Sequence, residues 1–102
     1  MKQINWTKGD VYSEQFVVYS NGVVLPLTGI VPSIQIVDNK ISMNNIVVRD
    51  GVVTDAANGI FEIEFLASDF TAAGSYHYRI ILDFTASSEK KTMPWGVFNV
   101  EP

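Results

Sequence analysis

The chain reads Gly59-Ile60-Phe61-Glu62-Ile63-Glu64-Phe65-Leu66 at the point where its alternation of apolar and polar side chains is clearest. A β-strand directs successive side chains to opposite faces, so Phe61, Ile63 and Phe65 would lie on one face and the two glutamates on the other. A strand with one apolar and one polar face is typical of an antiparallel sheet that covers a core on one side only. This stretch therefore predicts a half-buried strand.

A second alternation follows at once, from Ser75 to Phe84. Shorter strand-like runs, separated by turn residues about every ten positions, fill the rest of the chain, and no window keeps a helical period. This pattern predicts an all-β fold, a sandwich or small barrel of eight or so short strands that forms a single domain over residues 1–102. The second alternation would place five side chains on its inner face: Tyr76, Tyr78, Ile80, Leu82 and Phe84.

Two glycine dipeptides predict tight hairpins. Asn21-Gly22 and Asp50-Gly51 are the residue pairs that a type I′ turn prefers, because both of its central residues need positive φ. We therefore expect the strands that flank each dipeptide to pair with one another.

The composition argues against several classes of partner. The 102 residues carry a net charge of −4 and include no cysteine. Without a basic patch, we expect no binding to nucleic acid or to an anionic membrane, and no run is apolar enough to span a bilayer or to act as a signal peptide. The five aspartates expected in turns are not spaced as a calcium loop requires, so we predict no metal and no cofactor.

The segment between the two long strands resembles the corner that precedes strand F in immunoglobulin-like domains. There, an acidic residue precedes a small-Gly-x-Tyr group, and the tyrosine hydroxyl bonds to the backbone a few residues upstream. In this chain the resemblance assigns these positions to Asp69, Gly74 and Tyr76. It implies an immunoglobulin-like antiparallel β-sandwich of about 7–9 strands, in which this corner is structural and has no catalytic role.

A wider resemblance covers nearly the whole chain. It runs through Lys8-Gly9-Asp10, Asn21-Gly22, Leu27-Thr28-Gly29, Gly74-Ser75-Tyr76 and the closing Gly96-x-Phe98-x-Val100-x-Pro102. This order is similar to the immunoglobulin-like N-terminal domain of baseplate upper proteins, which occur in tailed phages and prophages of Gram-positive bacteria. The long helical and C-terminal regions that follow in full-length members are absent from this sequence, so it stands either alone or as part of a larger protein.

The resemblance implies a non-enzymatic structural protein of a phage or prophage virion, an assembly module of the tail or baseplate. Its partners would be other tail and baseplate proteins or further copies of itself, and it would be assembled in the cytoplasm of the bacterial host. Two alternatives stay open: a surface carbohydrate-binding module that uses Trp95, Trp6 or Tyr19 as a sugar platform, and a capsid decoration domain.

No catalytic constellation is evident. His77 is the single histidine, and on a strand it would face away from its neighbour Ser75, which opposes a Ser-His-Asp arrangement. Glu62 and Glu64 would lie ~7 Å apart on one face, a separation that suits a glycosidase pair. A solvated strand face explains both glutamates without a pocket, so we predict no enzyme.

The last strand contains the most informative ambiguity. If Phe98 and Val100 face inward, an unbroken period of two sends Met93 and Trp95 outward, where Ile81 would join them. The alternative is a bulge at Pro94-Trp95-Gly96 that reverses the register and buries Trp95. The interface residues predicted on this basis are Trp95, Met93 and Ile81, with Trp6 as a further candidate that is either part of the core or exposed in an N-terminal arm.

Overall fold

The computed structural model describes residues 2–102, and within these residues it contains eleven strands and no helix. The predicted all-β class is confirmed. The larger sheet has the order β1 (Ile4–Thr7), β11 (Gly96–Glu101), β9 (Gly74–Phe84), β5 (Ile30–Val37), β6 (Asn45–Asp50), with β10 (Glu89–Thr92) paired to β9. A three-stranded sheet has the order β2 (Tyr12–Val17), β8 (Ile60–Phe65), β7 (Val52–Asp55), and β3 (Tyr19–Ser20) pairs with β4 (Val23–Val24).

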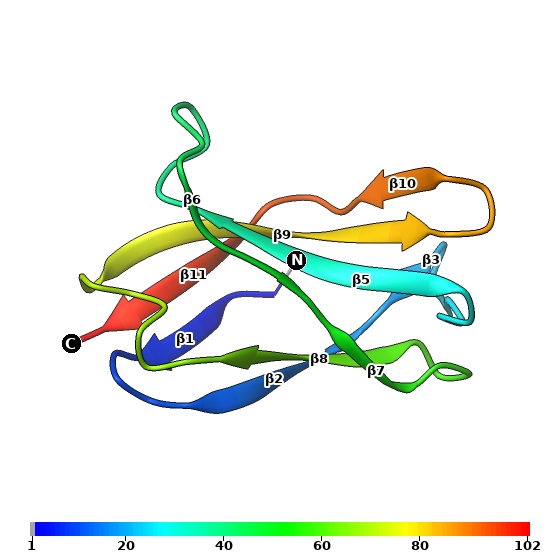
Figure 1. Cartoon of the computed structure of the whole chain (residues 1–102), viewed down its shortest axis with the longest axis horizontal. Helices are drawn as coiled ribbons and strands as arrows, with labels where there is room; N and C mark the ends of the chain where they lie inside the picture. Colours follow the sequence, from blue (N-terminus) through cyan, green and yellow to red (C-terminus); the bar gives the residue numbers. More distant parts are fainter. Residues whose placement is uncertain (1) are drawn as a thin grey trace.

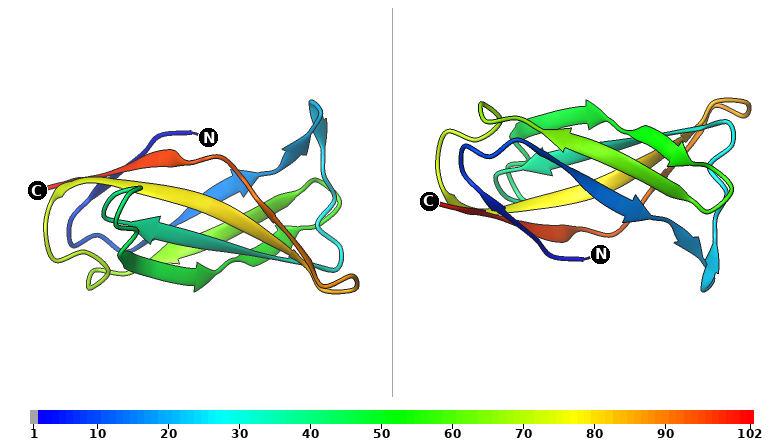
Figure 2. Two further views of the ribbon diagram at one scale, coloured as in Figure 1. Left: turned by 90° about the horizontal axis from the view of Figure 1, so that it is seen from above. Right: turned by 90° about the horizontal axis from the view of Figure 1, so that it is seen from below.

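The two larger sheets form opposite layers with the apolar side chains between them (Figure 1; Figure 2). Phe61, Ile63 and Phe65 of β8 are fully buried, as the alternation predicted. Phe65 meets Phe98 of β11 across the core in an edge-to-face contact, with ring centroids 5.1 Å apart. The inner side chains of β5 and β9 complete the core, most of them inaccessible to solvent: Ile34, Ile36, Tyr78, Ile80 and Leu82.

One strand pair is parallel, which corrects the prediction of a purely antiparallel sandwich. β1 runs parallel to β11, with Ile4 opposite Phe98 and Trp6 opposite Val100. The loop after Thr7 then takes the chain across to β2 in the other sheet. A pairing between the two ends of the chain has no turn between its strands, so no local signal announces it.

Asn21-Gly22 forms the predicted hairpin between β3 and β4. Both turn residues have positive φ, 54° and 77°. The hairpin is short because β3 and β4 pair at only two positions, and β3 is separated from β2 by the single residue Val18. Such short pieces raise the number of strands above the range that was predicted.

The prediction of a hairpin at Asp50-Gly51 is wrong, because the two flanking strands do not pair with one another. β6 ends at Asp50 and pairs with β5 of the larger sheet, whereas β7 begins at Val52 and pairs with β8 of the smaller one. Gly51 is instead the point where the chain crosses between the layers. A Cβ there would lie 2.8 Å from Phe61 Cδ2 and 3.0 Å from Ile63 Cδ1, so the glycine permits a close approach to β8.

The segment between β10 and β11 contains one extra residue relative to β9. Thr92 lies opposite Ile81 and Gly96 lies opposite Tyr78, so the three residues between Thr92 and Gly96 face only two residues of β9. An insertion of this kind is a bulge, and Pro94 lies within it. The predicted change of register exists, but it does not bury Trp95, which stays partly exposed.

Candidate assembly surface

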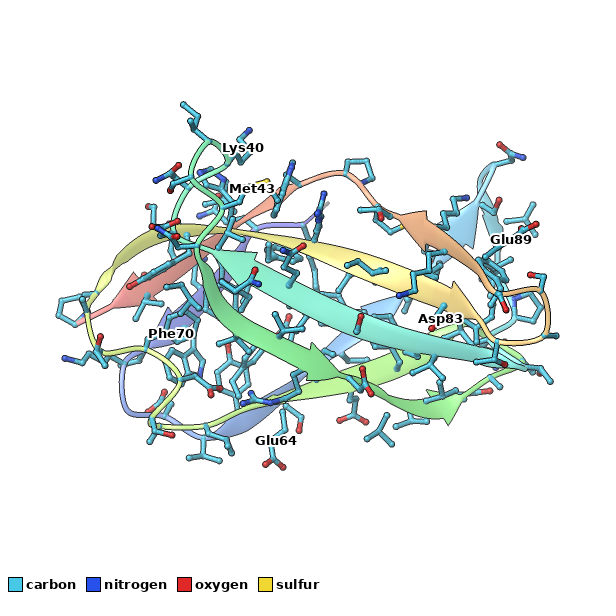
Figure 3. The ribbon with its side chains drawn as sticks, turned by 45° about the horizontal axis from the view of Figure 1, so that its top comes forward. Lys40, Met43, Glu64, Phe70, Asp83 and Glu89 are labelled. Carbon is cyan, nitrogen blue, oxygen red and sulfur yellow. The ribbon has the colours of Figure 1, made fainter. Side chains whose placement is uncertain are left out.

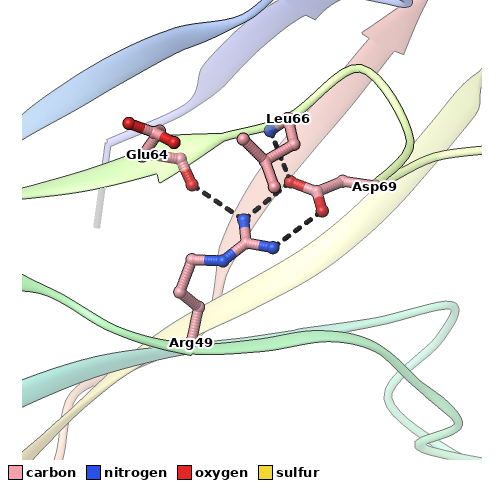
Figure 4. Close-up of polar contacts among 4 residues, drawn as sticks. All are labelled: Arg49, Glu64, Leu66 and Asp69. Carbon is pink, nitrogen blue, oxygen red and sulfur yellow. Dashed lines mark hydrogen bonds and ion pairs between the residues drawn. The ribbon is translucent and has the colours of Figure 1, made fainter.

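The corner before β9 is fixed by a tyrosine and an ion pair. The Tyr76 hydroxyl donates a hydrogen bond to the backbone oxygen of Ala72 at 2.7 Å, four residues upstream. Asp69 accepts hydrogen bonds from both terminal nitrogens of Arg49, at 2.7 and 2.8 Å, and from the Leu66 amide at 2.7 Å (Figure 4).

These contacts tie the corner to the opposite sheet. Arg49 belongs to β6 of the larger sheet and also donates to the backbone oxygen of Glu64 on β8. Its guanidinium lowers the pKa of Asp69 below the usual carboxyl value, and the carboxylate in turn raises the pKa of Arg49. The Arg49–Asp69 ion pair therefore acts as a brace between the larger sheet and the corner. Gly74 begins β9 after this corner, and no atom lies within 4 Å of the position that a Cβ would take there.

The outward face of the larger sheet carries Trp95 and its partners. Arg79 of β9 stacks over the Trp95 ring, with its Cζ 4.4 Å from the ring centroid. Its Nε donates to Gln35 Oε1 at 2.8 Å, and Gln35 Nε2 donates to Asn45 Oδ1 at 2.8 Å. An indole, a guanidinium and two amides therefore form one row across the sheet.

The structure brings together only part of the predicted interface set. Ile81 and Trp95 lie on the outward face, whereas Met93 is turned by the bulge to the inner side. There it packs against the core and lines a small apolar pocket of about 40 Å³ with Phe16 and Ile80.

Trp6 lies inside the core. It is 1% exposed, and its ring contacts Phe70 and Phe98 at centroid distances of 5.2 and 6.5 Å. The sequence left two positions open for Trp6, the core or an exposed N-terminal arm, and the structure places it in the core. Its side chain is not available on the surface of the folded chain.

A comparison with protein-family models identifies the relationship. The model of the BppU N-terminal domain matches residues 1–101. The chain belongs to the BppU N-terminal domain family. No curated protein matches the sequence significantly.

Membership of the BppU N-terminal domain family makes this a domain of a phage baseplate upper protein, a component of the phage tail. The family consists of baseplate structural proteins, and other phage tail proteins are the partners that membership suggests. The BppU match thus supports the predicted virion location at the level of the tail.

In this BppU domain the single histidine and the two glutamates of β8 lie on different sheets. His77 is partly exposed on the outward face of β9, opposite Val97. Glu62 and Glu64 lie on the outer side of β8. Within residues 2–102, no group of three or more His, Asp and Glu side chains is arranged to hold a metal ion, and no helix is long and apolar enough to cross a membrane.

Sequence reasoning missed Arg79 and Gln35, which hold and orient the Trp95 ring. The signal for Arg79 was available, because it shares with Ile81 the outward parity of its strand. The signal for Gln35 was not local, since its position beside Arg79 depends on the pairing of β5 with β9.

Proposed function

We propose that this chain is a non-enzymatic, immunoglobulin-like sandwich that joins parts of the phage baseplate through the outward face of its larger sheet. The Tyr76 hydrogen bond and the two-layer core support the immunoglobulin-like assignment, and the parallel pairing of β1 with β11 is a variation at its edge.

One observation carries the proposal: Trp95 is held on the surface in a fixed orientation. Its ring is stacked against Arg79, which Gln35 fixes in turn, and Val97 adds apolar surface that is 36% exposed. Tryptophan and arginine are the residue types that most often dominate protein interfaces, and a preordered pair loses little side-chain entropy when a partner binds.

The proposed contact therefore consists of Trp95, Arg79, Ile81 and Val97. It keeps Trp95 and Ile81 of the predicted set and leaves out Met93 and Trp6, which face inward. The same geometry gives less support to a carbohydrate platform at Trp95, because Arg79 covers one face of the ring that a sugar would use.

The test is binding to the tail proteins encoded beside this one. Trp95→Ala should reduce the affinity for its neighbour at least roughly tenfold, the change expected for a residue central to an interface. Val23→Ala is the matched control, because Val23 is an exposed apolar side chain, 69% exposed, on the small β3–β4 hairpin. Equal binding by both variants and the parent would show that this face is not the contact.

A further inference from the structure

The loop between β5 and β6 presents an apolar side chain at its tip. Ile41 is 97% exposed, the highest value among the exposed large hydrophobic residues. The loop stands clear of the two layers (Figure 1). Lys40 precedes Ile41, is also exposed, and makes no ion pair within residues 2–102.

The loop is held in one shape by its own side chains. Asp38 Oδ1 accepts hydrogen bonds from the amides of Asn39 and Asn44, and Asn39 Oδ1 accepts from the amides of Ile41 and Ser42. Hydrogen bonds to its carboxylate, the largest contribution coming from the Asn44 side chain, lower the pKa of Asp38. A preordered loop that exposes an isoleucine has the properties of a binding element.

A hollow of complementary character lies on the outward face of the larger sheet. Its volume is about 390 Å³, and its apolar part is formed by Val31, Val48 and Ile81 from three neighbouring strands. Val48 is 63% exposed, so this apolar surface is open to a partner. The hollow is large enough to receive one or two side chains.

The charges around the hollow favour a cation. Asp50 and Asp83 both line it, and neither forms an ion pair within the described part of the chain. Lys90 also lines it, opposite Asp83 in register, so the titratable groups leave the hollow with one net negative charge. An apolar floor beside a negative rim matches an isoleucine that follows a lysine.

We propose that the Lys40–Ile41 tip of one copy docks in the hollow of a second copy. Ile41 would lie on Val48 and Ile81, and the Lys40 ammonium would lie beside Asp50 and Asp83. The loop and the hollow belong to opposite ends of the sheet, with Lys40 and Met43 far from Asp83 and Glu89 (Figure 3), so a chain cannot fill its own hollow. The inference rests on the assembly role proposed above and assigns the surface by which copies associate.

Two different patches in contact make a heterologous interface, which builds rings or open arrays. This surface shares only Ile81 with the contact proposed above, which consists of Trp95, Arg79, Ile81 and Val97. Self-association through the loop and attachment through Trp95 can therefore be tested separately.

The experiment is sedimentation of the whole 102-residue chain over a concentration series up to about 1 mM, a range in which weak association is detectable. The parent should self-associate, and Ile41→Asp should weaken the association at least roughly tenfold. Val11→Asp is the control, because Val11 is 62% exposed on a different loop. Equal effects of the two substitutions would overturn the proposal.

A charge exchange makes the test specific. Lys40→Glu and Asp83→Lys should each weaken association, and the double variant should restore it because the opposed charges are again complementary. An equimolar mixture of the two single variants should form mixed assemblies, because the loop of each variant is complementary in charge to the hollow of the other. A parent that stays monomeric over the whole series, or a double variant no better than the single ones, would overturn the proposal, while intact binding through Trp95 would leave the proposed function standing.

Discussion

Arg49 and Asp69 join the edge strand of one sheet to the corner that leaves the other. The two hydrogen bonds between them are 2.7 and 2.8 Å long, and the Asp69 side chain is only 7% exposed. A paired carboxylate in this position is costly to leave without its partner, because the guanidinium would remain half-buried and unneutralised.

We expect Asp69→Asn to destabilise the domain by about 1.5–3 kcal/mol at neutral pH, the range for hydrogen bonds to charged groups. Chemical denaturation would measure the loss. Glu14→Gln is the control, since the Lys2–Glu14 pair is more exposed and should be worth less than about 1 kcal/mol. Equal losses of unfolding free energy from the two substitutions would contradict a special role for the Arg49–Asp69 pair.

The same pair predicts a pH dependence. The pKa of Asp69 is lower in the folded than in the unfolded state, so its contribution is complete above the unfolded value of about 3.9. The contribution is then lost as the pH falls towards the folded pKa. The difference in stability between the parent and Asp69→Asn should therefore shrink below about pH 4. A constant difference down to the acid transition would refute this linkage.

Tyr76→Phe removes only the hydroxyl that bonds to Ala72. We expect a loss of about 1 kcal/mol with an unchanged fold, because one neutral hydrogen bond is lost and the ring still packs on Phe70, 5.0 Å away. Thermal and chemical unfolding would measure it. Tyr19→Phe serves as the comparison, because Tyr19 is 55% exposed, and a similar loss there would show that the corner hydroxyl has no special importance.

A comparison of alanine substitutions at Gly59 and Gly29 distinguishes the cost of a positive φ from the cost of a steric clash. Both have positive φ, 68° and 74°, so alanine at either position costs roughly 1–2 kcal/mol. A Cβ at Gly59 would also lie 2.6 Å from the Leu25 backbone oxygen, whereas Gly29 has open space around it. Gly59→Ala should be clearly more destabilising than Gly29→Ala in denaturant titrations, and equal losses would show that the neighbouring backbone moves aside.

The two tryptophans should differ in their access to solvent. Trp95→Phe leaves Trp6 as the sole tryptophan, and because Trp6 is 1% exposed its fluorescence should be quenched only weakly by acrylamide. The parent should show an additional, more accessible component from Trp95. Strong quenching in the variant would mean that the first strand leaves the core in solution.

The predictable part of this fold was the part encoded locally. Phe61, Ile63 and Phe65 reveal their burial through simple alternation, and Asn21-Gly22 specifies its turn by its need for positive φ. Asp50-Gly51 carries the same kind of signal but joins two sheets, because the choice of strand partner depends on how the core closes around Gly51. Turn chemistry alone did not distinguish the two cases.

The candidate surface was less predictable than the core. Ile81 was placed correctly on the outward face by the parity of its strand, but Met93 depended on a bulge that adds one residue, and a shift of one residue reverses a side chain's direction. The hollow formed by Val31, Val48 and Ile81 requires the order of β6, β5 and β9, which no single segment encodes.

The parallel pairing of β1 with β11 has a mechanical consequence. Ile4 lies beside Phe98 and Thr7 beside Glu101, so the incoming and outgoing ends of the chain leave this pair in opposite directions. Tension applied through those ends would load the inter-strand hydrogen bonds together, in shear, instead of peeling them apart one after another. The sheet edge is thus oriented to resist stretching along the line that joins the two ends of the pair.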